Sequence, residues 1–286
     1  MKRVIKNVLK TCYKFYLENK ISGCKGNMLI VFMYHNVAPY SRNNTVTPKD
    51  FEEGLLYLIN KGFRNYSLNN LIERNFEFSG KGFVITIDDG EKDIINYCLP
   101  ILKKYKLNAT LFISPKLIGK SYGFSWKKIP KSIISFEEIE KYRGYKIEFM
   151  DEDDIKLWLE NGLEIGSHGL RHIDLSSISL DSELLEEEIL TSKIILEELI
   201  KIEIKAFCYP FGSFNDMVKD VVKRYYKCAL TINRGLVSDF NTVDPYELPR
   251  ITGANAFWLS YEIARAITKR LKKEKEGEKN RMYENK

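Results

Sequence analysis

Two adjacent carboxylates, Asp88 and Asp89, end an apolar run and precede a glycine in the segment GFVITIDDG, residues 82–90. Neighbouring side chains on a strand point to opposite faces, but a turn at Gly90 would bring both acids into one cleft. Two carboxylates in one cleft repel each other, and a cation beside them relieves that repulsion. One acid can then bind a metal while the other stays free as a base. The alternative is a solvated Asp-Asp-Gly turn between two elements.

Two of the three histidines, His168 and His172, lie four residues apart in the segment GSHGLRH, residues 166–172. Such a pair can converge on one ion in a helix or tight loop, and imidazole suits zinc and its neighbouring transition metals. Together with Asp89 the pair predicts a site of two histidines and one carboxylate, with positions open for water and substrate, as in catalytic metal sites. The alternative is two partly exposed polar histidines. The third histidine, His35, ends another apolar run.

The elements that would position these residues alternate along the chain. Short apolar runs predict buried strands at residues 28–37, 82–90, 108–114, 163–169, 206–212 and 228–232. Helical periodicity predicts helices at residues 47–61, 94–105, 151–161, 182–200, 216–225 and 257–272. The alternation predicts one α/β domain with a mainly parallel sheet, open or closed into a barrel. The candidate residues follow the carboxyl ends of strands, where barrel enzymes carry their catalytic residues.

The predicted organisation has three parts. Residues 1–27 predict a basic amphipathic helix, which lies on an anionic membrane surface or docks on its own domain. Residues 28–256 form the barrel domain, with an irregular stretch at about residues 116–150 that we interpret as an insertion or lid. Residues 257–286 form a C-terminal helix and a charged, frayed tail.

Composition limits the function classes. The chain has 286 residues, of which 44% are hydrophobic and 29% charged, as in globular proteins. Its formal net charge of +6 comes with no nucleic-acid-binding motif, so no nucleic-acid partner is expected. Five cysteines without a C-x-x-C pair favour a reducing compartment. Residues 1–20 resemble neither a signal peptide nor a spanning helix, so we expect the cytoplasm or the inner membrane face, with peripheral membrane contact through residues 1–20.

Five segments together resemble the motifs of the NodB-homology polysaccharide deacetylases, carbohydrate esterase family four. TIDDG, GSHGLRH and FCYPFG are similar to the three central motifs, and FMYHNV and LPRI are similar to flanking segments. The similarity covers roughly residues 28–252. It implies a distorted (β/α) barrel of mostly parallel strands, with Asp89, His168 and His172 as metal ligands and Asp88 as the general base.

The chain departs from the common members of that family at three points. Cys208 stands where an Arg is often found, no histidine follows His172, and no tryptophan securely matches the family's tryptophan motif. These departures fit a subgroup that resembles the deacetylases of biofilm poly-N-acetylglucosamine, in which a Tyr-His near the N-terminus supplies the general acid. Tyr34-His35 matches that position and implies His35 as the acid. The alternative is a strand-end histidine that hydrogen bonds to the backbone.

Four further residues have two interpretations each. Arg250 orients Asp88 by a charge-assisted hydrogen bond, or lies on the surface as most arginines do. Tyr34, Tyr209 and Phe211 stack on sugar rings, or pack in the core. A backbone N–H near Phe211 is the expected donor to an oxyanion.

The sequence therefore predicts metal-dependent hydrolysis of the acetamide of N-acetylated sugars, in a cell-envelope polysaccharide or its precursor. Zinc is the expected metal, with cobalt, nickel and manganese as the other divalent candidates. The alternatives are a carbohydrate-binding homologue that has lost catalysis, and a deacylase that removes an N-formyl or O-acetyl group from a lipid-linked sugar. Asp88 favours catalysis, because binding alone needs no free base next to a metal ligand.

Overall fold

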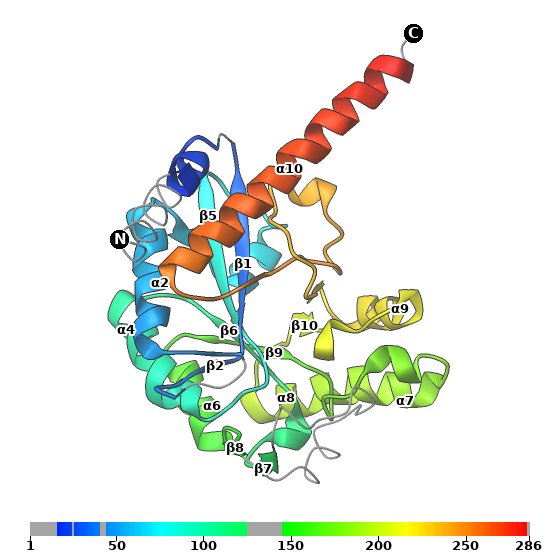
Figure 1. Ribbon diagram of the computed structural model, residues 1–286. Coiled ribbons are helices and arrows are strands. Elements are labelled where there is room, and N and C mark those ends of the chain that lie inside the picture. The colour runs from blue at the N-terminus through cyan, green and yellow to red at the C-terminus, as the bar shows by residue number, and fades with distance from the viewer. Residues whose placement is uncertain (1–15, 25, 41–43, 125–144, 285–286) are drawn as a thin grey trace.

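The computed structural model describes residues 16–24, 26–40, 44–124 and 145–284 (Figure 1). Its centre is an eight-stranded sheet in the order β11-β10-β9-β6-β5-β1-β12, with β4 paired to β5. All of these strand pairs are parallel. The strands are β1 (Met28–Tyr34), β4 (Arg64–Asn65), β5 (Lys81–Ile87), β6 (Thr110–Ile113), β9 (Glu164–Ser167), β10 (Ala206–Cys208), β11 (Cys228–Leu230) and β12 (Ile251–Thr252). The predicted α/β fold with parallel strands is confirmed.

The sheet is curved as a distorted half-barrel, and one short segment of chain contacts both of its edges. Leu248 forms a parallel bridge with Leu230 at the end of β11. Three residues later, Ile251 of β12 pairs with Phe32 of β1. The segment therefore draws the carboxyl ends of the strands around a common space, and the chemistry-bearing residues follow those ends.

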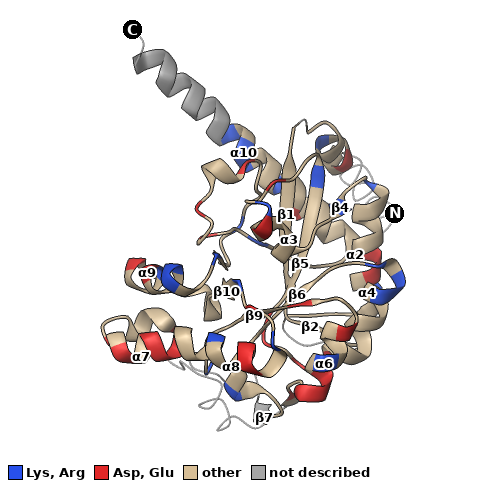
Figure 2. Ribbon diagram, turned by 180° about the vertical axis from the view of Figure 1, so that it is seen from behind, with Lys and Arg blue, Asp and Glu red and all other residues tan. Residues whose placement is uncertain are grey.

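Helices cover the outside of the sheet. They are α2 (Pro48–Asn60), α3 (Leu68–Glu73), α4 (Leu99–Tyr105), α6 (Glu152–Glu160), α7 (Ser182–Glu186), α8 (Ser192–Ile200), α9 (Asp216–Tyr225) and α10 (Ala256–Glu284). Figure 2 shows Lys, Arg, Asp and Glu mainly on these helices and on loops, while the central strands carry few of them. This distribution follows from the cost of burying a charge without a partner. No helix among the described residues is long and apolar enough to cross a membrane.

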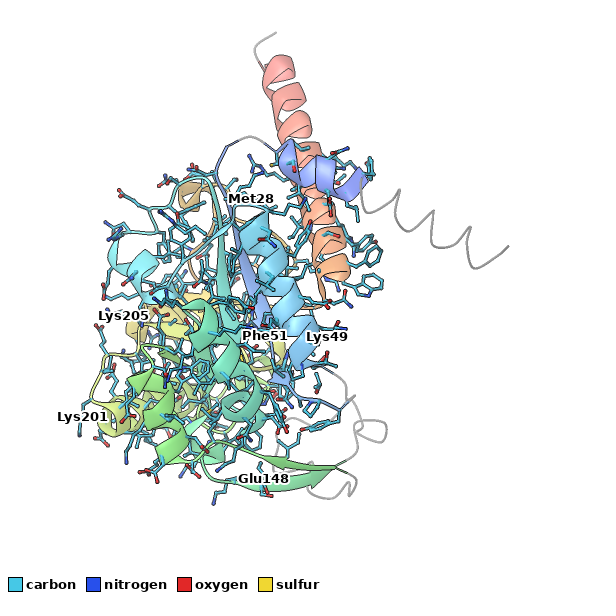
Figure 3. The ribbon with its side chains drawn as sticks, turned by 90° about the vertical axis from the view of Figure 1, so that its left-hand side faces the viewer. Met28, Lys49, Phe51, Glu148, Lys201 and Lys205 are labelled. Carbon is cyan, nitrogen blue, oxygen red and sulfur yellow. The ribbon has the colours of Figure 1, made fainter. Side chains whose placement is uncertain are left out.

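The helix α2 illustrates how local sequence sets these elements. Thr47 caps it by accepting a hydrogen bond from the Asp50 N–H, and Pro48 occupies the first turn, where its missing N–H costs nothing. Phe51 is buried against the sheet, while the side chain of Lys49 is 83% exposed (Figure 3). The predicted helix at residues 47–61 is confirmed within one residue at each end.

Two small strand pairs lie outside the main sheet. β2 (Asn36–Val37) pairs with β3 (Thr45–Val46), directly after β1. β7 (Ser121–Phe124) pairs in antiparallel fashion with β8 (Tyr145–Glu148), at the two ends of the predicted insertion. Residues 125–144, which are the middle of that insertion, lie outside the described residues.

Three predicted elements need comment. The helix expected at residues 182–200 is interrupted by a π-helical turn at Glu187–Thr191. The last helix continues to Glu284 rather than ending at residue 272, which is consistent with the many Lys and Glu residues, good helix formers, in its last turns. Most of the predicted N-terminal helix lies outside the described residues. Of the part that is described, Leu17 and Ile21 are buried in the main core, so this end docks on its own domain.

Candidate active site

β5 delivers Asp88 and Asp89 into the cleft through a tight turn. The Asp88 N–H donates to the Tyr34 carbonyl at 2.9 Å, which extends the pairing of β1 and β5 by one residue. The Gly90 N–H then donates to the Asp88 carbonyl at 3.0 Å, and Asp89 has a φ of +76°. This is a three-residue turn with a strained central residue, a conformation that costs about 1–3 kcal/mol. Both acids are buried, so the solvated turn is excluded.

β9 delivers the two histidines, and both are buried. The Nδ1–H of His168 donates to the Cys208 carbonyl at 2.7 Å, because a carbonyl oxygen can only accept. This contact leaves the His168 Nε2 facing Asp89, with Asp89 Oδ1 3.5 Å away. The His172 Nε2 lies 3.1 Å from the same oxygen. The interpretation of two partly exposed histidines is therefore wrong for this structure.

A buried glutamate, which is not among the residues predicted from the sequence, holds the loop between the histidines. Glu188 Oε2 accepts the N–H groups of Leu170 and Arg171, both at 3.1 Å. Its Oε1 accepts the Arg171 Nη1–H at 2.6 Å. The loop needs such a support because it ends at His172, a non-glycine residue with a φ of +56°. Glu188 therefore fixes the backbone from which both histidines project.

The first of two candidate metal-binding groups is Asp89, His168 and His172. One ligand atom from each of these residues lies within 4.8 Å of the other two. Burial raises the pKa of the Asp89 carboxyl, but hydrogen bonds from His168 and His172 lower it by more, so its pKa is well below the ordinary value. An ionised carboxylate with two imidazole nitrogens is a donor set that suits zinc and similar divalent ions. The hydrogen bond from His168 to a carbonyl is the outer support that metal-binding histidines commonly have.

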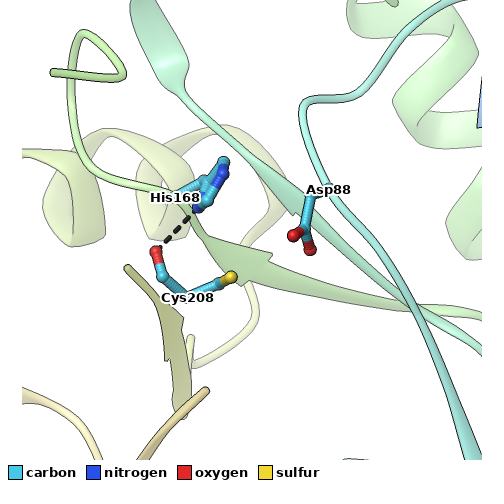
Figure 4. A group of neighbouring side chains, drawn as sticks. All are labelled: Asp88, His168 and Cys208. Carbon is cyan, nitrogen blue, oxygen red and sulfur yellow. Dashed lines mark hydrogen bonds between the residues drawn. The ribbon is translucent and has the colours of Figure 1, made fainter. Parts of the chain in front are cut away.

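The second candidate group, Asp88, His168 and Cys208, fits a cation poorly, although its atoms are equally close. Figure 4 shows the His168 Nδ1 directed at the Cys208 carbonyl, which occupies that nitrogen. The Cys208 Sγ and both oxygens of Asp88 accept hydrogen bonds from Arg250. A metal ion here would lie against a buried guanidinium, and like charges repel strongly at such short range. The structure therefore favours the group that contains Asp89.

Arg250 is fully buried and forms a bidentate ion pair with Asp88. Its Nη1 and Nη2 lie 2.7 Å and 2.8 Å from the two carboxylate oxygens. Its Nε–H donates to the Thr231 carbonyl at 2.8 Å, so the guanidinium is itself fixed. Burial raises the pKa of the Asp88 carboxyl, but Arg250 lowers it by more, and the net shift is downward. Asp88 is therefore an ionised acceptor at neutral pH, and the surface position considered for Arg250 is wrong.

These residues line a cleft of about 460 Å³, within the range of about 300–1,000 Å³ that small-molecule sites occupy. The residues around it come from the ends of several strands and include Asp88, Asp89, His168, His172, Arg250, His35, Phe211, Ile232 and Arg234. His35 follows β1 and is half-buried. The structure thus brings all predicted ligands, the candidate base and the candidate acid to one cleft.

The three aromatic residues expected to stack on sugar rings lie in different environments. Tyr34 is only 2% exposed and packs edge-on against Phe51, with ring centroids 4.9 Å apart. Tyr209 is 0% exposed and stacks on Phe214. Sugar stacking by these two tyrosines is therefore wrong for this structure, because core neighbours cover their rings. Phe211 is 43% exposed at the cleft, with its ring edge-to-face against His172, and it is available to a substrate.

Comparisons with known proteins agree with this geometry. The family pattern described as "Polysaccharide deacetylase" matches residues 77–227. A Bacillus subtilis protein provisionally named a polysaccharide deacetylase is 25% identical over 215 residues, which is 73% of this chain and 66%, just under two thirds, of that relative. The fold is similar to that of the Streptococcus pyogenes deacetylase PplD, solved in complex with acetate (TM-score 0.65, 22% identity, covering 85% of this chain and 99% of that one). It is also similar to that of IcaB from Ammonifex degensii (TM-score 0.65, 20% identity, covering 85% and 98%).

The matched family segment contains both acids and both histidines of the cleft, and the fold extends over most of each solved relative. The resemblance found in the sequence motifs is thereby confirmed. The chain belongs to the polysaccharide deacetylases, a family of hydrolases that act on the amide bonds of acetylated sugars.

Proposed function

We propose that this chain removes acetyl groups from N-acetylated sugar residues of a cell-envelope polysaccharide or its precursor, with a divalent metal held by Asp89, His168 and His172. The observation that carries the proposal is the pairing of two chemically different acids in one cleft. Asp89 faces the imidazoles, whereas Asp88 faces Arg250. When bound, a metal such as zinc would supply Lewis-acid chemistry, which polarises an acetamide carbonyl and lowers the pKa of water.

Asp88 is the proposed general base. Each of its oxygens accepts one hydrogen bond from Arg250, which leaves a second lone pair on each to take a proton. Asp88 removes a proton from water as the water oxygen attacks the acetamide carbon. The N–H of Phe211 is the proposed donor to the oxyanion that forms. The bidentate contact with Arg250 holds the base in one orientation, so little reorganisation is needed during the reaction.

His35 is the proposed general acid. As the carbon–nitrogen bond breaks, the sugar nitrogen takes a proton from His35 and leaves as an amine, and the acyl group leaves as acetate. Among the described residues, His35 is the only histidine at the cleft outside the proposed metal-binding group.

The test is acetate release from short N-acetylglucosamine oligomers, with added zinc or cobalt, by the wild type and by Asp88→Asn. Release should fall about 10²- to 10⁴-fold in the variant, as expected for loss of a general base, and should stop in a chelator. Asp220→Asn, an exposed carboxylate on α9, is the matched control and should retain full activity. Absence of acetate release from well-folded, metal-loaded wild type would contradict the proposal, and formate or O-linked acetate release would redirect it to another acyl group.

A further inference from the structure

A groove lies between the described part of the first helix, residues 16–22, and the last helix, α10. Figure 3 shows the short first helix, in blue, lying across α10. The volume of the groove is about 640 Å³, which is larger than that of the catalytic cleft. Arg234 lines both the groove and the cleft, so the two spaces adjoin each other at this residue.

Part of the wall of the groove is apolar. Leu17 of the first helix, Ile251 of β12 and Ala264 of α10 line it, and each of them is at most 3% exposed. Tyr261 and Tyr16 add aromatic rings, and Tyr16 is 56% exposed. An aliphatic chain that lies against this wall would remove apolar surface from water, which is favourable.

The rest of the wall is cationic. Five basic side chains and one acidic side chain line the groove, namely Lys20, Arg234, Arg265, Lys269, Lys272 and Glu262. The whole chain has 45 basic and 39 acidic residues, so basic residues are concentrated at this place. Glu262 Oε1 lies 3.6 Å from Arg234 Nη1 and 4.0 Å from Arg265 Nη1, and one carboxylate neutralises only part of the charge. The charged positions of α10 recur at helical spacing, which places them on one face of the helix.

This charge decides between the possible occupants of the groove. Residues 1–15 contain no acidic residue and five basic ones, so a cationic wall repels them: Lys2, Arg3, Lys6, Lys10 and Lys14. A second copy of this chain would bring the same cationic surface and is disfavoured for the same reason. A molecule with an anionic head and an apolar chain matches both parts of the wall. Phospholipids have this chemistry, and lysine and arginine side chains bind phosphate oxygens well.

We propose that the groove binds an anionic phospholipid of a membrane surface. The headgroup lies against the basic side chains, and the acyl chain lies against the apolar part of the wall. Because Arg234 belongs to both the groove and the catalytic cleft, the bound lipid places the membrane surface beside the cleft. The cleft then meets glycan that lies close to a membrane. The inference does not depend on the proposed function, since lipid binding is measurable without any reaction.

The experiment measures co-sedimentation of the full chain with vesicles of phosphatidylcholine, with and without phosphatidylglycerol. Wild type should bind at least about tenfold more tightly when phosphatidylglycerol is present, and Lys20→Gln with Lys269→Gln should lose about tenfold or more of that affinity, since each lysine near an anionic surface contributes about fivefold. Tyr16→Ala should weaken binding about threefold through loss of apolar contact. The matched control is Lys49→Gln with Lys156→Gln, which removes the same charge from exposed positions on α2 and α6 and should retain wild-type binding.

The outcomes separate the groove from less specific attraction. Equal losses in the two double variants would show that net charge alone draws the chain to the vesicles, and would overturn the site. Binding that needs no anionic lipid would also overturn it. Displacement by free glycerol phosphate at the concentration of the lipid would assign the groove to a soluble anion, and equally tight binding of polyglutamate would assign it to an acidic protein. Either result would contradict the proposal.

Acetate release is measured in parallel on short soluble oligomers. Both double variants should release acetate as the wild type does, because none of the four lysines lines the catalytic cleft. Lipid binding without acetate release would retain the groove and contradict the proposed function. Acetate release without lipid binding would do the reverse. Thermal unfolding of the double variants should match that of the wild type, since substitutions of surface lysines change stability little.

Discussion

The residues of the cleft fall into two groups that the protein holds in different ways. The anchored group is buried and tied into the sheet by short hydrogen bonds, and it comprises Asp88, Asp89, His168, His172 and Arg250. The rim group, His35 and Phe211, lies at the cleft surface and is partly exposed. The anchored group contains the proposed ligands and base, whose geometry must stay fixed during the reaction. The rim group contains the side chains that would meet the substrate.

Residues with a strained backbone occur in both groups. Asp89, His172 and Phe211 are non-glycine residues with a positive φ, and all three lie at the cleft. In the anchored group the surrounding core maintains that strain, since Glu188 and the extended pairing of β1 and β5 fix the backbone on either side. These contacts hold the polar groups of the cleft in defined positions, which is the arrangement expected for electrostatic catalysis.

Among the substitutions in the anchored group, we expect Arg250→Met to have the largest effect on stability and activity. This change leaves the Asp88 carboxylate buried and unpaired, which typically costs about 3–5 kcal/mol. We therefore expect a large fall in the free energy of unfolding, measured by chemical denaturation, and loss of nearly all acetate release. Arg224→Met, an exposed arginine on α9, is the matched control and should change neither quantity. Arg250→Lys keeps a charge without the bidentate contact, so an effect as small as that of the control would contradict the role assigned to this pair.

The rim group is tested by His35→Gln. We expect acetate release from an N-acetylated sugar to fall about a hundredfold, because the amine then leaves without a proton donor. An activated aryl acetate has a leaving group that needs no proton, so its hydrolysis should change little. The ratio of the two rates is the measurement, and it cancels any general damage to the cleft. Equal losses on both substrates would show that His35 acts on binding or folding rather than on the leaving group.

The sequence was sufficient to predict strands and site residues where a local pattern of residues determines the secondary structure. The apolar run before Asp88 predicts a buried strand, and parallel strands bring their carboxyl ends together, so the four residues of the two polar motifs converge as predicted. It was insufficient for the aromatic residues. Tyr209 and Phe211 are two positions apart, yet Phe214 covers one ring while the other is exposed. The neighbours that decide this become adjacent only in the folded chain.

Glu188 was missed for a different reason, since the chain did carry a signal for it. It lies in a run of acidic residues, Glu186 to Glu188, that looks like a solvated helix face. The buried positions Leu185, Ile189 and Ser192 recur at helical spacing around this run, and Glu188 falls on the same face. A buried carboxylate needs partners. Those partners, the N–H groups of the histidine loop, are backbone groups that no side-chain pattern reveals.

The smallest expected effect comes from Glu188→Gln. Glutamine keeps the shape of the side chain but weakens its hydrogen bonds to Leu170 and Arg171, so the loop that carries the histidines becomes less well held. We expect metal affinity, measured by competition with a chelator, to fall about tenfold, as is common for groups that support metal ligands. The control is Glu187→Gln, since Glu187 also contacts Arg171 but its side chain is 47% exposed. If both variants weaken metal binding equally, the effect comes from the charge of Arg171 rather than from the buried support of the loop. A selective loss in Glu188→Gln would show that the anchored group depends on a residue that touches neither metal nor substrate.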